Sequence, residues 1–188
     1  MLKEHLRTYG VLTEEDLSEL DGITYTKQLR KNDFFVREGE VSKEVGFVLS
    51  GQLRSFYYSS NGDEVTYCFR LPNSFVSAYA SLITKSPSEE NLQALSDVEL
   101  TCISRENFYR LEENNANWMK FSKMVAQMEY MNLEKRIFLL QRESAEKRYA
   151  DLLKNEPELL RLVSLDQLSS YLGVTPRHLS RIRGLVAK

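Results

Sequence analysis

Residues 164–188, at the end of the chain, read SLDQLSSYLGVTPRHLSRIRGLVAK. This stretch predicts two short amphipathic helices joined by a tight turn. Ser164 is a good N-cap residue, and Leu165, Leu168 and Leu172 follow it at the spacing of one helical face. The first helix of the pair therefore has one apolar side, which must be covered by a neighbouring helix.

The second helix is predicted to begin after Gly173, which stands where a helix end often adopts a left-handed conformation. Thr175 can cap the new helix, and Pro176 suits its first position, where a missing N–H costs nothing. Leu179 and Ile182 then face back toward the first helix. The pattern is that of a helix-turn-helix, which places its second helix in the DNA major groove. An ordinary helical hairpin with a solvated basic face is the alternative that these residues leave open.

The remaining positions of the pair add two observations. The place where the helices approach most closely must be small, and it is occupied by Ser169, although alanine is the commoner residue there. The other faces of the second helix carry polar and basic residues, namely Arg177, His178, Ser180, Arg181 and Arg183.

The charge distribution favours the helix-turn-helix. The whole chain has a net charge of −2, which argues against a general polyanion binder. From residue 161 onward, however, five basic residues and one acid give a net charge of +4, so residues 1–160 carry −6. An acidic body with a basic end suits a protein that touches phosphates at one end only.

Composition excludes several other classes of protein. The 188 residues are 42% hydrophobic, no apolar run is long enough to span a bilayer, and the N-terminus does not resemble a secretory signal, so we expect a cytoplasmic protein. Cys68 and Cys102 are too few to hold an iron–sulfur cluster or a structural zinc, and packing roles are expected for both. His5 and His178 lie at opposite ends of the chain. No cofactor or metal is therefore predicted.

The segment from about residue 23 to residue 103 is predicted to form strands. Runs rich in Val, Phe, Tyr and Thr alternate with turn signals, of which Asn61-Gly62 is the strongest hairpin signal. The predicted strands are Thr24–Leu29, Asp33–Arg37, Val45–Leu49, Leu53–Tyr58, Glu64–Phe69 and Glu99–Ile103. Many short strands at this spacing indicate a sandwich or a jelly-roll barrel.

Residues 105–154 are predicted to be helical because they are nearly free of Gly and Pro, with a separate helix that starts at Ser144-Ala145-Glu146 and runs to about Lys154. Residues 155–157 are predicted to end that helix and to begin the linker to the helix-turn-helix. One apolar line at three-four spacing comprises Trp118, Phe121, Val125 and Met128, and it continues through Asn132 and Leu139. It is broadened by Met124, Met131 and Phe138. Such a stripe predicts a coiled-coil seam between two copies, with Asn132 helping to set the register. The alternative is that the stripe packs on its own domain.

The order of these parts resembles the cyclic-AMP receptor and Fnr family of bacterial transcription regulators. The resemblance covers nearly the whole chain and is carried by NDFFVREGE (32–40), FVLSGQLR (47–54), SAEKRY (144–149), LGVTP (172–176) and LSRIR (179–183). It implies an α+β protein with an N-terminal double-stranded β-helix, that is, a jelly-roll barrel of the cyclic-nucleotide-binding type. The expected domains are a β-roll effector domain over 1–112, a long dimerisation helix over 113–142 and a helix-turn-helix domain over 143–188.

The sequence departs from this family where an effector would bind. Cyclic-nucleotide binders of the family carry a Gly-Glu pair followed by an Arg-Ser or Arg-Thr pair, whereas residues 73–96 contain neither Arg nor Gly. Glu89 and Glu90 would repel a phosphate there. The effector is therefore expected to be something other than cyclic AMP, or absent. Oxygen sensing of the Fnr type and haem sensing are not expected either, because the sequence lacks the cysteine cluster of Fnr and a barrel histidine that could bind haem. An effector pocket could be lined by Tyr57, Tyr58, Tyr67, Phe69, Ser77 and Tyr79, although barrel core is the preferred assignment for each.

The resemblance also implies DNA contacts at matching positions. Arg181 stands at a position where the family commonly has an Arg that reads a guanine. At the position of Arg177 the family often has a Glu, so the operator should differ from that of the cyclic-AMP receptor. Pro176 has no side-chain donor. Candidate phosphate contacts are Ser164, Thr175, His178 and Ser180. Arg183 and Lys188 are expected to add non-specific attraction.

The predicted function is that of a homodimeric, sequence-specific transcription regulator that binds double-stranded DNA at an imperfect palindrome. Its further candidate partners are RNA polymerase and an unknown small-molecule effector. No catalytic constellation is present, so an enzyme is not expected. A metal-dependent cupin-like enzyme is disfavoured because the barrel lacks histidine. The remaining alternative is a small-molecule-binding or interaction module whose DNA-binding tail has degenerated.

Overall fold

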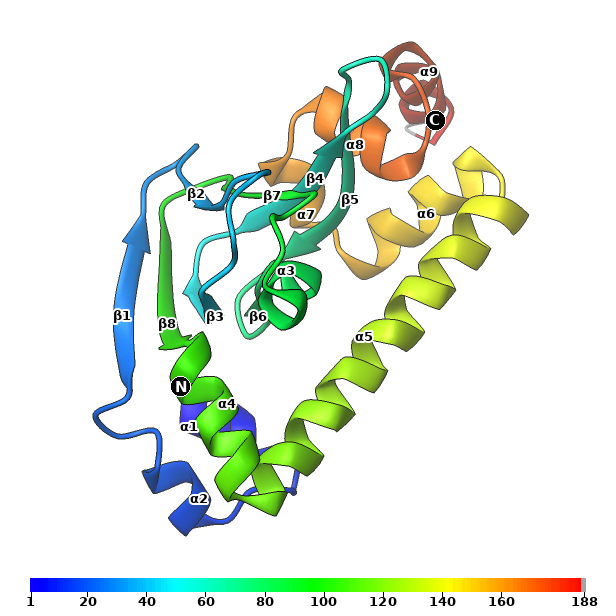
Figure 1. Ribbon diagram of the computed structural model, residues 1–188. Helices are drawn as coiled ribbons and strands as arrows, with labels where there is room; N and C mark the ends of the chain where they lie inside the picture. The colour runs from blue at the N-terminus through cyan, green and yellow to red at the C-terminus, as the bar shows by residue number, and fades with distance from the viewer. Residues whose placement is uncertain (187–188) are drawn as a thin grey trace. The chain divides into compact units, whose positions relative to one another are not determined.

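The computed structural model describes the backbone of residues 1–186. The chain divides into two compact units. The barrel unit comprises Met1–Ser55 and Phe69–Met128. The C-terminal unit comprises Phe56–Cys68 and the residues from Glu129 onward. The tip of one hairpin of the barrel sheet therefore groups with the C-terminal helices (Figure 1).

Two four-stranded sheets form the barrel. The first has the order β1-β8-β3-β6 and is antiparallel. Its strands are β1 (Thr24–Leu29), β8 (Val98–Ser104), β3 (Glu44–Ser50) and β6 (Phe75–Val76). The second has the order β2-β7-β4-β5. Its strands are β2 (Phe34–Val36), β7 (Asn91–Ala94), β4 (Leu53–Tyr58) and β5 (Glu64–Arg70). The predicted jelly-roll type of barrel is confirmed.

Apolar side chains from both sheets form the barrel core, which comprises Leu29, Phe35, Val36, Val48, Leu53, Val76, Ala78, Leu92, Ala94, Val98, Leu100 and Cys102. The turn between β3 and β4 requires glycine. Gly51 has φ +80, and a Cβ atom there would lie 2.1 Å from the carbonyl oxygen of Asp97. Glycine is thus required at this turn both by the left-handed backbone and by the close approach of a neighbouring chain segment.

All six predicted strands are present, and two more were missed. β7 carries polar Asn91 and Gln93, and β6 has only two residues, so neither shows a strand-like apolar pattern. The short helix α3 (Tyr79–Thr84) between them was missed as well. These elements fall within residues 73–96, where the sequence is rich in serine and weak in periodicity.

Helices from both ends of the barrel segment pack together in a second core. The helices are α1 (Leu2–Arg7), α2 (Glu14–Ser18), α4 (Arg105–Asn114) and the start of α5 (Ala116–Arg142). The buried core residues are Leu6, Leu12, Leu17, Leu20, Leu111, Trp118 and Phe121. The helix α2 begins after Thr13, with a capping box between Thr13 and Asp16.

Residues 105–155 form three helices, α4, α5 and α6 (Ala145–Asn155). The predicted start of a separate helix at Ser144 is confirmed by α6, whereas the break between α4 and α5 was not predicted. The apolar stripe on α5 also differs from the predicted coiled-coil seam. Trp118 and Phe121 are only 5% and 6% exposed, and they pack in the core of their own unit. For this part of the stripe, the alternative of packing on its own domain is the correct one.

The C-terminal unit contains α6, α7 (Leu159–Leu162), α8 (Leu165–Leu172), α9 (Pro176–Val186) and the hairpin segment 56–68. Its buried apolar residues include Phe56, Ala145, Tyr149, Leu152, Leu159, Val163, Leu168, Leu172, Leu179 and Ile182. The short helix α7 stands where only a linker was predicted, and it is held by the fully buried Leu159. Among the described residues, no helix is both long and apolar enough to cross a bilayer.

Candidate nucleic-acid interface

The helix pair α8–α9 has the caps that the sequence predicts. Ser164 Oγ accepts the N–H of Gln167 at 3.1 Å, and the Gln167 side chain accepts the N–H of Ser164 at 3.0 Å. Gly173 ends α8 with φ +67, in the left-handed region. Thr175 Oγ1 accepts the N–H of His178 at 3.2 Å and so caps α9. The boundaries of both helices are therefore fixed by local hydrogen bonds.

The two helices close over a small shared core. Leu168, Leu179 and Ile182 are completely buried. Ser169 is 2% exposed, and its hydroxyl donates to the carbonyl oxygen of Asp166 at 3.0 Å. Because that hydroxyl has a partner, serine can replace alanine at the close approach without an unsatisfied polar group.

The outer face of α9 gathers the predicted DNA-contacting residues. Thr175, Pro176, Arg177, Ser180 and Arg181 are exposed there, and Ser164 is exposed at the start of α8. A hollow of about 430 Å³ is lined by Thr175, Arg177, His178 and Arg181. Two guanidinium groups and a hydroxyl thus converge on one open surface, a set of donors that suits phosphates and the acceptor edges of bases.

His178 has a neighbour that sequence reasoning missed. Its Nε2 lies 3.6 Å from Oε1 of Glu146 on α6. The pKa of Glu146 is lowered by its own backbone N–H and by the Ser144 hydroxyl, with a smaller contribution from His178. A carboxylate therefore stands beside the basic surface.

Arg183 differs from the exposed arginines. Its side chain is half-buried, and its Nε is buried without a hydrogen-bond partner. The predicted non-specific role of this residue is therefore less well supported than that of Arg177 or Arg181. Lys188, to which the same role was given, lies outside the described residues.

Two further arginines, which sequence reasoning also missed, hold the C-terminal end of α8. Arg148 Nε donates to the carbonyl oxygen of Leu172 at 3.0 Å, and Arg136 donates to that of Tyr171 at 2.5 Å. Arg136 also stacks on the Tyr171 ring, with its Cζ 3.8 Å from the ring centroid. No sequence pattern identifies them, because their partners are backbone carbonyls 24 and 35 residues away.

In the region assigned to an effector, part of the sequence interpretation was wrong. Tyr57, Tyr58 and Tyr79 are 42%, 50% and 44% exposed, so these three are surface residues and not barrel core. Ser77 instead donates a hydrogen bond to the carbonyl oxygen of Glu44 at 3.1 Å. Tyr57 and Tyr58 are the last residues of β4, whose first four residues are buried, so the strand is exposed on both faces at its end, and Tyr79 lies on the helix α3.

A polar cluster lies in the first sheet around the buried carboxylate of Glu44. The Glu44 carboxylate accepts hydrogen bonds from Tyr25 and Lys27. Cys102 is fully buried nearby, and burial raises the pKa of its thiol to about 12. Cys102 is therefore an unreactive packing residue, as predicted from its strand-like neighbours.

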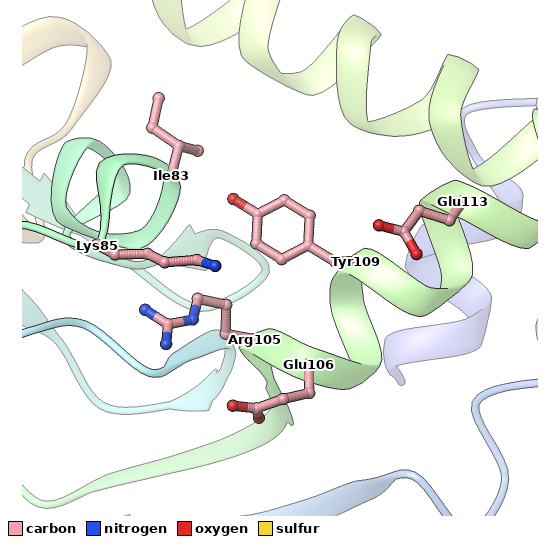
Figure 2. Close-up of a pocket in the computed structure, with 6 residues that line it drawn as sticks. All are labelled: Ile83, Lys85, Arg105, Glu106, Tyr109 and Glu113. Atoms are coloured by element: carbon pink, nitrogen blue, oxygen red, sulfur yellow. The ribbon is translucent and has the colours of Figure 1, made fainter.

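A shallow hollow of about 440 Å³ lies between α3 and α4 (Figure 2). It is lined by Ile83, Lys85, Arg105, Glu106, Tyr109 and Glu113. Lys85 and Arg105 extend toward each other on one side, while Glu113 lies beyond Tyr109 (Figure 2). Two cations and two carboxylates balance in charge, so the lining does not form the positive pocket that an anionic effector requires.

Known proteins resemble the chain both in sequence and in fold. Residues 26–115 match the family model of the cyclic nucleotide-binding domain. The transcriptional activator protein Anr of Pseudomonas aeruginosa is 25% identical over 186 residues, covering 91% of this chain and 74% of that protein. An anaerobic regulatory protein of Pasteurella multocida is 24% identical, covering 94% of this chain and 68% of that protein.

Among solved structures, FixK2 from Bradyrhizobium japonicum has a TM-score of 0.76 at 21% identity, with 88% of this chain and 85% of that chain covered. This likeness supports the fold, including the order of barrel, long helix and C-terminal helices. Over nearly its whole length the chain is therefore similar to transcription regulators of the Crp/Fnr type.

Proposed function

We propose that this protein is a homodimeric, sequence-specific DNA-binding regulator that acts in the cytoplasm. The observation that carries the proposal is the hollow on α9 where Thr175, Arg177, His178 and Arg181 converge. These side chains project from a helix that is capped and packed on its partner, so they need little reorganisation to meet a rigid duplex.

The residues divide into two roles. Arg181 and Arg177 are the base readers, because a guanidinium can donate two parallel hydrogen bonds to guanine O6 and N7. The hydroxyls of Ser164, Thr175 and Ser180 and the ring of His178 are the phosphate contacts that set the register. Pro176 shapes the start of α9 and donates nothing.

Dimerisation is supported by a different face of α5 from the one that the sequence stripe indicated. Large apolar side chains at helical spacing are exposed on this face, which we call the α5 apolar face: Met119, Tyr130, Leu133, Ile137 and Leu140. Their positions follow the three-four pattern of a coiled-coil seam. Asn132 lies off this face, so its predicted register role finds no support. A second copy packed here would present two α9 helices about 34 Å apart, one DNA turn, as a palindromic operator requires.

The effector is proposed to be something other than cyclic AMP, or absent. The proposal rests on residues 73–96, which lack arginine and carry Glu89 and Glu90. Titration calorimetry with cyclic AMP and cyclic GMP should give no binding heat. Saturable binding of either nucleotide would overturn this part of the proposal.

The test of DNA binding begins with selection of the preferred duplex from a random pool, followed by fluorescence anisotropy. Arg181→Ala should weaken binding to the selected operator by about 1–3 kcal/mol while affecting random DNA little. An equal loss on both would remove the base-reading role. Absence of salt-sensitive binding to any duplex would favour the alternative, an effector or interaction module with a degenerate tail.

The test of dimerisation compares two substitutions on the same helix. Leu133→Glu places a charge on the α5 apolar face, whereas Met131→Glu places it on another face of the helix, and the two native side chains are 47% and 49% exposed. Sedimentation velocity should show a monomer for Leu133→Glu and a dimer for Met131→Glu. The opposite result would assign the seam to the face of Met131.

A further inference from the structure

One arginine side chain bridges the ends of two helices in the C-terminal unit. The guanidinium of Arg148, on α6, donates to the carbonyl oxygens of Leu140 at 3.2 Å and Glu143 at 2.6 Å. These two carbonyls belong to the C-terminal end of α5 and the residue that follows it. The same guanidinium donates to the carbonyl oxygen of Leu172, the last residue of α8. Three helices, α5, α6 and α8, therefore meet at a single planar group.

Arg136 makes a second link between α5 and α8. It lies on α5 and reaches the carbonyl oxygen of Tyr171, the residue before Leu172. Burial lowers the pKa of Arg136, the largest effect on this group, although the neighbouring Tyr171 partly opposes it. A half-buried cation thus contacts one backbone carbonyl and one aromatic ring. Burying a charge in this way is unfavourable unless the contacts fix the position of α8 on α5.

The chemistry of these contacts fixes the orientation of α5 and α8 relative to each other. The last four carbonyls of a helix have no partner within the helix and carry its negative partial charge, so a cation there is favoured. A guanidinium holds its N–H groups in a rigid plane, so carbonyls of α5 and α8 bound to it are held in one mutual orientation. Packing adds to this, since a Cβ at Gly173 would lie 3.2 Å from Leu140.

We propose that Arg148, assisted by Arg136, is a positioning residue that sets the half-site spacing of the operator. The inference rests on the proposed function, in which the C-terminal half of α5 pairs with a second copy and α9 reads DNA. The arginines join that half of α5 to α8, and α8 shares its core with α9. The orientation of α9 relative to the dimer axis then depends on the Arg148 contacts, although Arg148 itself lies outside the predicted DNA-contacting set.

The test uses the full chain and the operator selected by the wild-type protein. The central spacer of that operator is lengthened and shortened one base pair at a time, and affinity is measured for each duplex and for an isolated half-site. Wild-type protein should prefer one spacing. Arg148→Gln should reduce that preference by about tenfold, the order expected from loss of charge-assisted hydrogen bonds, while half-site affinity stays the same. Arg148→Lys should restore only part of it, because an ammonium lacks the planar fork.

Arg142→Gln is the matched control. It also removes one positive charge near the C-terminal end of α5, where Arg142 stacks on Phe138 with its Cζ 4.5 Å from the ring centroid. This control should keep the wild-type spacing preference. Circular dichroism and a thermal melt check that each variant is folded; if Arg148→Gln is not, Arg136→Gln is measured in its place and should reduce the same preference. If the folded variant weakens all spacings equally, the positioning role is wrong even though DNA binding stands. If wild-type protein binds no duplex, the proposed function fails instead.

Discussion

The backbone N–H of Thr66 donates a hydrogen bond of 2.8 Å to the side-chain oxygen of Ser170, a residue 104 positions later in the chain. The same hydroxyl donates to the carbonyl oxygen of Glu64 at 3.0 Å. Ser170 on α8 thereby satisfies two groups of β5, which lies at the end of its sheet, as a neighbouring strand would. This contact explains why the hairpin tip groups with the C-terminal helices (Figure 1).

Ser170→Ala should destabilise the C-terminal unit. The substitution leaves the Thr66 N–H and the Glu64 carbonyl without this partner, which costs about 1–3 kcal/mol where water cannot replace it. Chemical denaturation measures the loss, and amide hydrogen exchange should show faster exchange at Thr66. Ser180→Ala, on the exposed face of α9, is the control and should leave both unchanged. Unaltered exchange at Thr66 in Ser170→Ala would contradict the assignment.

Acid should weaken the second core of the barrel unit through Asp16. Burial alone would raise the pKa of this carboxyl, but hydrogen bonds from the Thr13 N–H and from Asn115 and Asn117 outweigh it and lower the pKa to about 2. A lowered pKa in the folded state means stability that is present above pH about 4 and is lost as pH falls toward about 2. The ionised Asp16 carboxylate contributes about 1–2 kcal/mol to the free energy of unfolding.

Asp16→Asn should remove this dependence on pH. Urea denaturation curves of the wild type and the variant, recorded between neutral pH and pH about 2, should converge as Asp16 in the wild type becomes protonated. The comparison variant is Asp21→Asn, at an exposed carboxylate paired with Lys3. Its curves should stay parallel to those of the wild type. A constant difference for Asp16→Asn across the range would show that the carboxylate charge is not the source.

Two glycine substitutions in the helix-turn-helix should have opposite effects. Gly173 has φ +67, and a Cβ there would press on Leu140, so Gly173→Ala should destabilise by about 1 kcal/mol or more. Gly184 lies within α9, and a Cβ there would meet nothing within 4 Å. Gly184→Ala should therefore stabilise by about 0.5–1 kcal/mol through helix propensity. Thermal melts distinguish the two, and a shift in the same direction for both would refute the argument.

Arg177→Glu should change which base the operator prefers and not merely weaken binding. Arg177 is exposed at the start of α9, where it can donate to guanine, whereas a carboxylate accepts from the amino group of cytosine. Selection from a random duplex pool with each protein should give operators that differ at one position of each half-site. Arg161→Glu, which reverses a charge outside α8 and α9, should keep the wild-type operator. An unchanged operator for Arg177→Glu would assign Arg177 to phosphate contact.

The helix-turn-helix was the part most accessible to sequence reasoning, because its helix boundaries are set by interactions between residues close together in the sequence. Ser164, Gly173 and Thr175 act through hydrogen bonds or backbone conformations within a few residues. The barrel was predicted at the level of its strands, since their apolar and β-branched runs mark them directly. The weakly patterned β6, β7 and α3 were missed because their residues gain stability mainly from neighbours far along the chain.

The α5 helix shows where pattern reading reached its limit. Its Trp118 stripe has the period of a seam, yet its buried N-terminal part covers the core of its own unit, while the face of Leu133 and Ile137 stays exposed. Periodicity identifies an apolar face but does not name the surface that covers it. Likewise, Tyr57 and Tyr58 are exposed because they lie at the end of β4, beyond its four buried residues, and the apolar pattern of the strand does not show where its burial ends.

By itself, the sequence determined the types of the strongly patterned elements, the turn at Gly173, the acidic body with its basic end, and the basic face of α9, because each depends on neighbouring residues or on a simple count. Only the tertiary structure decided that Ser170 holds the β5 edge and that Arg136 and Arg148 hold the end of α8. Those contacts join side chains to backbone groups far away in the chain. A backbone carbonyl is the same for every residue type, so no sequence pattern can reveal which arginine it binds.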